Sequence, residues 1–172
     1  MGQQQLLLLV LGIVIVGLAV VVGIQSFNEG RQKSEIDRYT GIGVEMAGDI
    51  IAHYSKPRAM GGGGQSSAAL GTLTVSALGL PQTFSDMYAG YTRTGYQSNG
   101  IRRDLMMSTT NPAWHITTYP LVAGGTRVEV YVFGPRPECV VSRSNYFGVA
   151  TWSDGNDHAT PPANPNSARC AW

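Results

Sequence analysis

The chain has 172 residues, a formal net charge of +1 and a charged fraction of 13%, about half the usual share of charged residues. This length suits one compact domain plus a terminal segment. The near-neutral charge gives no electrostatic basis for binding nucleic acid, so no nucleic-acid partner is expected.

Residues 6–24 form an uninterrupted run of Leu, Val, Ile, Ala and Gly without a polar side chain. As a helix rising ~1.5 Å per residue, the run would be about 28 Å long, close to the hydrocarbon thickness of a bilayer. A soluble domain of this size needs no helix that is apolar on every face. The run is therefore expected in lipid or in the core of an assembly of identical helices. The residues expected to make that core are Leu6, Leu7, Leu8, Leu9, Val10, Leu11, Ile13, Val14, Ile15, Val16, Leu18, Val20, Val21, Val22 and Ile24.

Three glutamines, Gln3, Gln4 and Gln5, precede the run and lie at its expected entrance. A cleaved secretory signal peptide normally has a basic residue before its apolar core and a small-residue cleavage site after it. No Lys or Arg precedes this run, and no small-residue pattern follows Ile24. We therefore expect a retained segment that anchors the chain or assembles with other copies.

The helix is predicted to continue beyond the apolar run. Charges at spacings of three and four, such as Arg31 with Glu35, support an exposed helix. Pro57 is expected to end it, so that the helix extends from about Gln3 to Ser55 within a first region of residues 1–56. An apolar series at the same spacings predicts one face that packs on the rest of the chain: Ile36, Tyr39, Gly43, Ala47, Ile50 and Tyr54.

The next residues, 57–67, are predicted to form a flexible connector, because they contain four consecutive glycines, Gly61 to Gly64. A β-rich head domain is predicted over residues 68–172. At its start, the alternation of Leu73, Val75 and Ala77 permits a strand. Residues 81–100 are rich in turn formers and are predicted to be a loop with a short helical turn.

Two alternating segments, Trp114–Val122 and Arg127–Phe133, flank Gly124-Gly125 and predict a β-hairpin. Pro120 is expected to place the first strand at a sheet edge or to end it. Residues 146–152 are another strand candidate, and residues 153–166 are predicted to be a loop. The predicted fold class is α+β: a long N-terminal helix, apolar in its first half and amphipathic in its second, packed on an antiparallel β-sheet domain.

Two cysteines, Cys139 and Cys170, lie in this head domain. An even count in a chain with an export-like N-terminus predicts one disulfide between them. Two buried free thiols in a cytosolic protein are the alternative.

The residues that usually carry chemistry form no recognisable constellation. Asp104 and Glu129 are isolated carboxylates, and the polar stretch 154–158 resembles a calcium loop only faintly, without its terminal bidentate Glu. The histidines lack the spacing of metal ligands: His53, His115 and His158. The chain is therefore not expected to be an enzyme, and no cofactor, metal or small-molecule substrate is expected.

In this order of elements the chain resembles a type IV pilin, or a pilin-like subunit of the wider type IV filament superfamily. The resemblance rests on the apolar run Leu6–Ile24, its amphipathic continuation to about Ser55, the sheet, and the Cys139 and Cys170 pair. It implies a structural subunit that waits in the inner, or cytoplasmic, membrane through its helix. It then self-assembles with identical subunits into an extracellular helical filament on the cell surface.

The chain departs from the pilin pattern at its N-terminus. Pilins usually carry Glu at mature position five, where this sequence has Gln5; cleavage after Gly2 would place Leu7 there instead. A start of Gly then Gln is reminiscent of archaeal-type class III signals, and pseudopilins of secretion systems are a close alternative. Bacterial and archaeal types both fit, as do adhesion, motility and DNA uptake as roles.

Two other functions compete with a filament subunit. The chain would alternatively be a single-pass membrane-anchored surface domain that binds a ligand without polymerising, or an anchored enzyme, which the absent catalytic pattern disfavours. A simple anchor more often changes to a flexible stalk where it leaves the membrane. The amphipathic helix that continues directly from the apolar run therefore favours the filament subunit.

Overall fold

The computed structural model describes residues 2–66, 73–88, 91–107, 114–121, 125–147, 164–166, 168–170 and 172. The chain divides into two compact units, residues 1–35 and 36–172. The helix α1, Gly2–Ser55, contributes residues to both units. The predicted helix is confirmed. It begins one residue before the predicted start at Gln3, and it ends at Ser55 as predicted.

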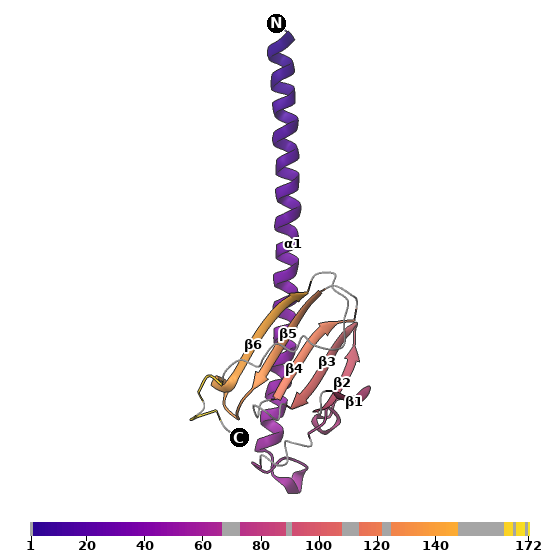
Figure 1. The fold of residues 1–172 in the computed structure, drawn as a ribbon, viewed down its shortest axis with the longest axis vertical. Helices are drawn as coiled ribbons and strands as arrows, with labels where there is room; N and C mark the ends of the chain where they lie inside the picture. Colours follow the sequence, from indigo (N-terminus) through magenta and orange to yellow (C-terminus); the bar gives the residue numbers. More distant parts are fainter. Residues whose placement is uncertain are drawn as a thin grey trace. The chain divides into compact units, whose positions relative to one another are not determined.

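The second unit is built on a six-stranded sheet in the order β1-β2-β3-β4-β5-β6 (Figure 1). Every strand pairs antiparallel with its neighbours in sequence. Together with α1, this sheet confirms the α+β fold class. The strands are β1 (Phe84–Tyr88), β2 (Tyr91–Ser98), β3 (Ile101–Met107), β4 (Trp114–Pro120), β5 (Gly125–Val132) and β6 (Val140–Phe147).

The face of α1 that packs on the sheet is the one that its periodicity predicts. Tyr39, Gly43, Ala47 and Ile50 are buried, and Met46 joins them. Alternating side chains of the strands meet this helix face, and each large apolar side chain that becomes fully buried contributes about 1.5–3 kcal/mol. The sheet residues of this core include Leu105, Trp114, Ile116, Val128, Val130 and Val132.

Gly43 is the residue that lets α1 approach β5 closely. A Cβ atom at Gly43 would lie 2.6 Å from Cγ2 of Val130. We expect Gly43→Val to cost about 1–3 kcal/mol of unfolding free energy through overpacking. Gly48 is the matched control, because nothing lies within 4 Å of a Cβ there, and Gly48→Ala should gain up to ~1 kcal/mol of helix propensity. Denaturant unfolding of the detergent-solubilised chain measures both; equal stability of Gly43→Val and the wild type would contradict this packing.

The glycine run, Gly61 to Gly64, is hydrogen-bonded to the end of α1, whereas the sequence predicts a flexible connector there. After a 3₁₀ turn at Arg58–Met60, its amides return to the end of α1: Gly63 N–H donates to the His53 carbonyl at 2.8 Å and Gly64 N–H to the Lys56 carbonyl at 2.9 Å. A Cβ at Gly62 would lie 2.2 Å from that Lys56 carbonyl oxygen. The run therefore satisfies carbonyls at the helix end that would otherwise lack partners, and its lack of side chains allows the close approach.

The loop predicted over residues 81–100 is wrong, because β1 and β2 both lie entirely within it. The sheet turns from β2 to β3 at Asn99 and Gly100, with φ of 52° and 73°. Positive φ at both central residues, between the paired Ser98 and Ile101, is the geometry of a two-residue hairpin turn.

Two further strand predictions are corrected. The alternation of Leu73 and Val75 leads into a 3₁₀ turn at Ser76–Leu78 rather than a strand, with both residues buried against the core. The strand predicted at residues 146–152 begins earlier, since β6 covers Val140–Phe147. Residues 148–152 lie outside the described residues.

The predicted hairpin of β4 and β5 is confirmed by pairs from Trp114 with Val132 to Thr118 with Val128. Pro120 ends β4, but the strand lies between β3 and β5, so it is not an edge strand. Residues 122–124 of the predicted turn lie outside the described residues, as do residues 153–163 of the predicted loop.

Candidate assembly helix and buried charged network

The apolar segment of α1 is exposed along its whole length. All fifteen large apolar side chains predicted to form its core, from Leu6 to Ile24, are between 50% and 67% exposed, and Gln3 to Gln5 are exposed as well. Among the described residues, α1 is the one helix long and apolar enough to cross a membrane, and no residue of its most apolar window is buried. Exposing so large an apolar surface to water is energetically unfavourable, so such a surface is normally covered by lipid or by other protein.

A second feature lies on the face of the sheet opposite α1. One row of directly opposite residues crosses five strands: Gly95, Asp104, Thr117, Glu129 and Arg143. These residues alternate along their strands with the core residues that meet α1, so they point to the other side of the sheet. Asp104 and Glu129 are both buried, which is unusual for carboxylates without partners.

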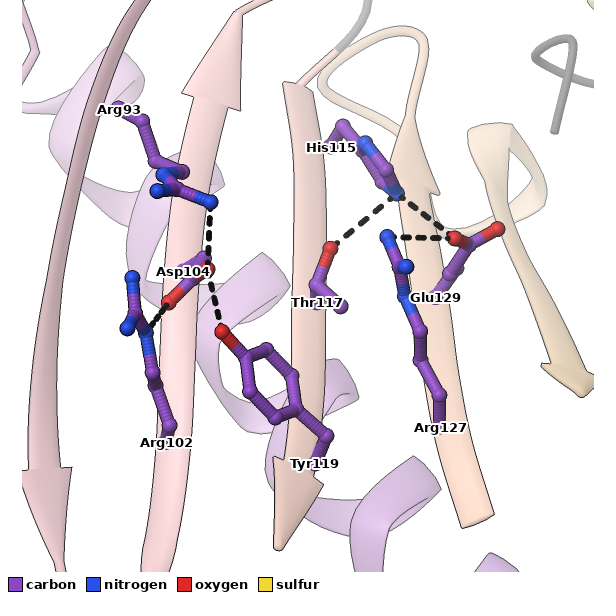
Figure 2. A network of polar contacts seen from close by, with 8 residues as sticks. All are labelled: Arg93, Arg102, Asp104, His115, Thr117, Tyr119, Arg127 and Glu129. Atoms are coloured by element: carbon purple, nitrogen blue, oxygen red, sulfur yellow. Dashed lines mark hydrogen bonds and ion pairs between the residues drawn. The ribbon is translucent and has the colours of Figure 1, made fainter. Parts of the chain in front are cut away.

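Asp104 on β3 is held by three side chains from three strands (Figure 2). Its Oδ1 accepts from Nε of Arg102 at 2.9 Å, and its Oδ2 accepts from the Tyr119 hydroxyl at 3.0 Å. A guanidinium nitrogen of Arg93 lies 3.7 Å from Oδ2. The Arg102 guanidinium also stacks 3.9 Å from the centre of the Phe84 ring, so this cluster joins β1 to β4.

Glu129 on β5 has partners on its own strand and on β4 (Figure 2). Its side chain is fully buried. Oε1 lies 3.0 Å from a guanidinium nitrogen of Arg127 and 3.7 Å from Nε2 of His115. Oε2 accepts from the Tyr131 hydroxyl at 3.0 Å. The His115 ring stacks on the Tyr131 ring at 4.5 Å between centres, and Thr117 Oγ1 lies 3.4 Å from the same Nε2.

Burial by itself would raise the pKa of the Glu129 carboxyl. The hydrogen bond and charge of His115, the charge of Arg127 and the hydrogen bond from Tyr131 outweigh that effect and lower this pKa below its ordinary value of 4.5. Burial, together with Glu129, raises the pKa of Tyr131, and burial, together with Asp104, raises that of Tyr119. Both phenols therefore stay protonated, and each donates a hydrogen bond to its carboxyl partner, Tyr131 to Glu129 and Tyr119 to Asp104.

The contacts of this network join side chains of neighbouring strands, from β1 to β5. A nucleophile–base–carboxylate relay uses both ring nitrogens of its histidine, whereas Nε2 of His115 lies beside both Thr117 and Glu129. In the described part of the chain, no three His, Cys, Asp or Glu residues could hold a metal ion. His53 lies near the end of α1 and is partly buried, and His158 lies outside the described residues.

The sequence prediction that Asp104 and Glu129 are isolated is therefore wrong. Antiparallel pairing places both opposite Thr117, and the arginines that neutralise them lie two residues away on their own strands. The sequence does contain a signal for these ion pairs: opposite charges two residues apart, which lie on the same face of a strand. The two pairs are Arg102 with Asp104 and Arg127 with Glu129. The meaning of this signal depends on strand register, which a single sequence does not provide.

The predicted disulfide is confirmed: Cys139 and Cys170 are joined, with their Cα atoms 5.3 Å apart. Cys139 ends a 3₁₀ turn at Pro137–Cys139, and both sulfurs lie in a small second core with Tyr131 and Phe133. Closing a loop of this length contributes about 3–4 kcal/mol in the chain-entropy account.

The disulfide also holds the C-terminal residues near the end of α1. Beyond Cys170, Trp172 packs edge-on against Tyr54, with ring centres 5.1 Å apart. Trp172 therefore covers part of the last turn of α1.

No family model, curated protein or solved structure matches this chain. The long apolar helix, the antiparallel sheet and the disulfide are compatible with a pilin-like architecture.

Proposed function

We propose that the chain is a structural subunit of an extracellular filament similar to type IV pili, and that it self-assembles through its apolar N-terminal helix. The observation that supports this function is the exposure of every large apolar side chain from Leu6 to Ile24. Burying these side chains among the same helices of other copies removes apolar surface from water, worth about 25 cal/mol per Å². The identical subunits are each other's partners, and no catalysis is involved.

The same helix would hold each subunit in the cytoplasmic membrane before assembly, because the length of its apolar run, residues 6–24, matches the bilayer core. The disulfide between Cys139 and Cys170 is typical of an oxidising compartment, which supports a head domain outside the cytoplasm. Membrane insertion before assembly and a surface-exposed filament afterwards are consistent with both features.

A single-pass anchored surface domain that does not polymerise is the second candidate, since one apolar helix is enough to anchor a protein. The filament is favoured because α1 is a single helix from Gly2 to Ser55. Its apolar segment continues without a linker into the residues that pack on the sheet, so a bundle of such helices would carry the head domains with it.

Shearing of intact cells followed by high-speed centrifugation separates these candidates. We expect the chain in the sheared supernatant to sediment as a polymer, and to remain polymeric in 1 M NaCl, because contacts between apolar helices are not screened by salt. An anchored domain would stay with the cells until detergent is added. Recovery of the chain only after detergent, as a monomer, would contradict the filament.

A further inference from the structure

The sheet ends in two different edge strands, β1 and β6 (Figure 1). The two edges run in opposite directions, because the chain direction reverses at every pairing from β1 to β6. β6 has eight residues and contains neither Pro nor Gly, the residues that commonly protect an edge strand or interrupt it. An edge of this kind offers its outward backbone groups to another strand.

The outward backbone groups of β6 follow from its pairing with β5. Phe133 N–H donates to the Cys139 carbonyl at 2.9 Å, in register with the β5–β6 pairs. Because hydrogen-bonded pairs alternate along an antiparallel ladder, Arg143 also bonds towards β5, whereas the N–H and C=O groups of Ser142 and Ser144 point away from it. Both serines are exposed. These groups form the free edge of β6 within the described part of the chain.

The same alternation gives the outward groups of β1. The residues that close the two-residue turn between β2 and β3 exchange both of their backbone hydrogen bonds. Alternation along β2 then directs the backbone groups of Gly95 towards β1, where Gly95 pairs with Phe84. The N–H and C=O groups of Ser85 and Met87 therefore point away from β2. Each edge thus presents two residues with the same spacing.

We infer that β6 of one copy of this chain pairs antiparallel with β1 of the next copy, so that the sheet continues from one head domain to another. In the register that joins the outward groups, Ser142 lies opposite Met87 of the next copy. Ser144 then lies opposite Ser85, and both pairs are hydrogen-bonded. The opposite directions of the two edges allow this pairing between copies that point the same way.

Charge favours this register. It sets Arg143 directly opposite Asp86, the one charged residue of β1. Both positions belong to the sheet face opposite α1, since Arg143 pairs with Glu129 and Asp86 with Arg93 inside each copy. Opposite charges directly across two strands are stabilising, whereas two β6 strands paired around Arg143 would place like charges opposite each other.

The contact repeats along a polymer. Every copy uses β6 towards one neighbour and β1 towards the other, so neither edge is used up by a single pair. A contact between two different surfaces that does not close into a ring gives an open helical polymer. The common direction of the copies rests on the proposed function, because their apolar segments share one core.

A proline at an outward position tests the edge. Ser142→Pro removes an N–H group that points away from β5, a change that an edge strand tolerates. We expect it to lower the yield of sheared filaments about tenfold, because each contact loses a hydrogen bond and the strands are held apart. Ser142→Ala keeps the amide and is the matched control. Filaments at wild-type yield from a Ser142→Pro chain that forms its disulfide would overturn the contact.

Charge reversal tests the register. Arg143→Glu should lower the filament yield about threefold, and adding Asp86→Arg should restore it. Arg169→Glu, which changes an exposed arginine outside the strands, should leave the yield unchanged. An Arg143→Glu yield that Asp86→Arg lowers further would contradict this pairing.

Cysteine cross-linking in the full chain gives a readout that does not depend on yield. Directly opposite residues of a non-hydrogen-bonded pair have Cα atoms about 4.5 Å apart, within the range of a disulfide. Chains with both Arg143→Cys and Asp86→Cys should form a ladder of linked copies on non-reducing gels, because the two positions lie at opposite edges of one copy. Neither substitution alone should link copies.

Two cross-linking results would overturn the head-to-tail contact. One is a linked dimer from Arg143→Cys alone, which would show β6 pairing with itself. The other is filaments of the double cysteine variant without a ladder after oxidation. A wild-type chain that forms no filaments would instead overturn the proposed function.

Discussion

Cells that express Val14→Asp are expected to yield no sheared filaments. Val14 lies near the middle of the apolar segment, and its side chain is 52% exposed, so it needs cover from lipid or from other copies. An aspartate at the centre of a membrane helix costs about 2.5–3.5 kcal/mol. In a filament the same penalty recurs in every subunit, and the carboxylates of neighbouring copies would also repel one another.

The matched control is Val14→Leu, which keeps the segment apolar and should retain filaments at wild-type yield. Formation of the Cys139–Cys170 disulfide in Val14→Asp, monitored on non-reducing gels, shows whether the head domain still folds. Filaments at wild-type yield from a folded Val14→Asp chain would contradict an assembly core made by residues 6–24.

Glu129→Gln is expected to lower the unfolding free energy by about 3–5 kcal/mol, the usual cost of removing one partner from a buried ion pair. The fully buried Glu129 carboxylate is the shared partner of Arg127, His115 and Tyr131. Its loss leaves the Arg127 guanidinium in a dry environment without a compensating charge. Glu138→Gln is the matched control, since the Glu138 side chain is 53% exposed and lies 3.9 Å from Arg136; it should change stability by less than ~1 kcal/mol.

The pH dependence of stability provides a second test of the same group. The pKa of Glu129 is lowered in the folded chain, so its ionised form stabilises the fold above the ordinary pKa of 4.5. This contribution is lost as the pH falls from 4.5 through the lower folded pKa. Denaturant unfolding of the wild type between pH 7 and pH 3 should show this loss, and Glu129→Gln should lack it. Wild-type and Glu129→Gln chains of equal stability at pH 7 would contradict the network.

The helix and its packing face could be predicted from the sequence because both depend on local periodicity. The uninterrupted apolar run sets the first half of α1, and the spacing of Tyr39, Gly43, Ala47 and Ile50 sets the face that packs on the sheet. The strands β4 and β5 can be predicted for the same reason, since Val128, Val130 and Val132 alternate with polar residues.

The sequence does not predict the first strands, because their turn formers and polar residues outweigh a weak alternation of apolar and polar residues. β2 contains Thr, Arg, Gly and Gln, and Gly95 interrupts it. That glycine is required, because a Cβ there would lie 2.3 Å from the Phe84 ring and 2.4 Å from the Arg103 carbonyl oxygen. Asn99-Gly100 was the usable signal for the β2–β3 hairpin.

The buried charged network could not be predicted from one sequence. Asp104 and Glu129 are far apart along the chain and lie near each other only because both pair with Thr117. A shift of one residue in either pairing would move a carboxylate to the opposite face of the sheet. The disulfide was predictable because the chain has only two cysteines, whereas the register that gives Glu129 its partners follows from the folded sheet.

The most direct test of the filament is negative-stain electron microscopy of material sheared from cells that express the wild-type chain. We predict thin filaments of uniform width, in which labelled antibodies against the head domain bind along the whole length. Sheared material without filaments, with the chain retained in the membrane fraction, would contradict a polymer and establish the anchored surface domain instead.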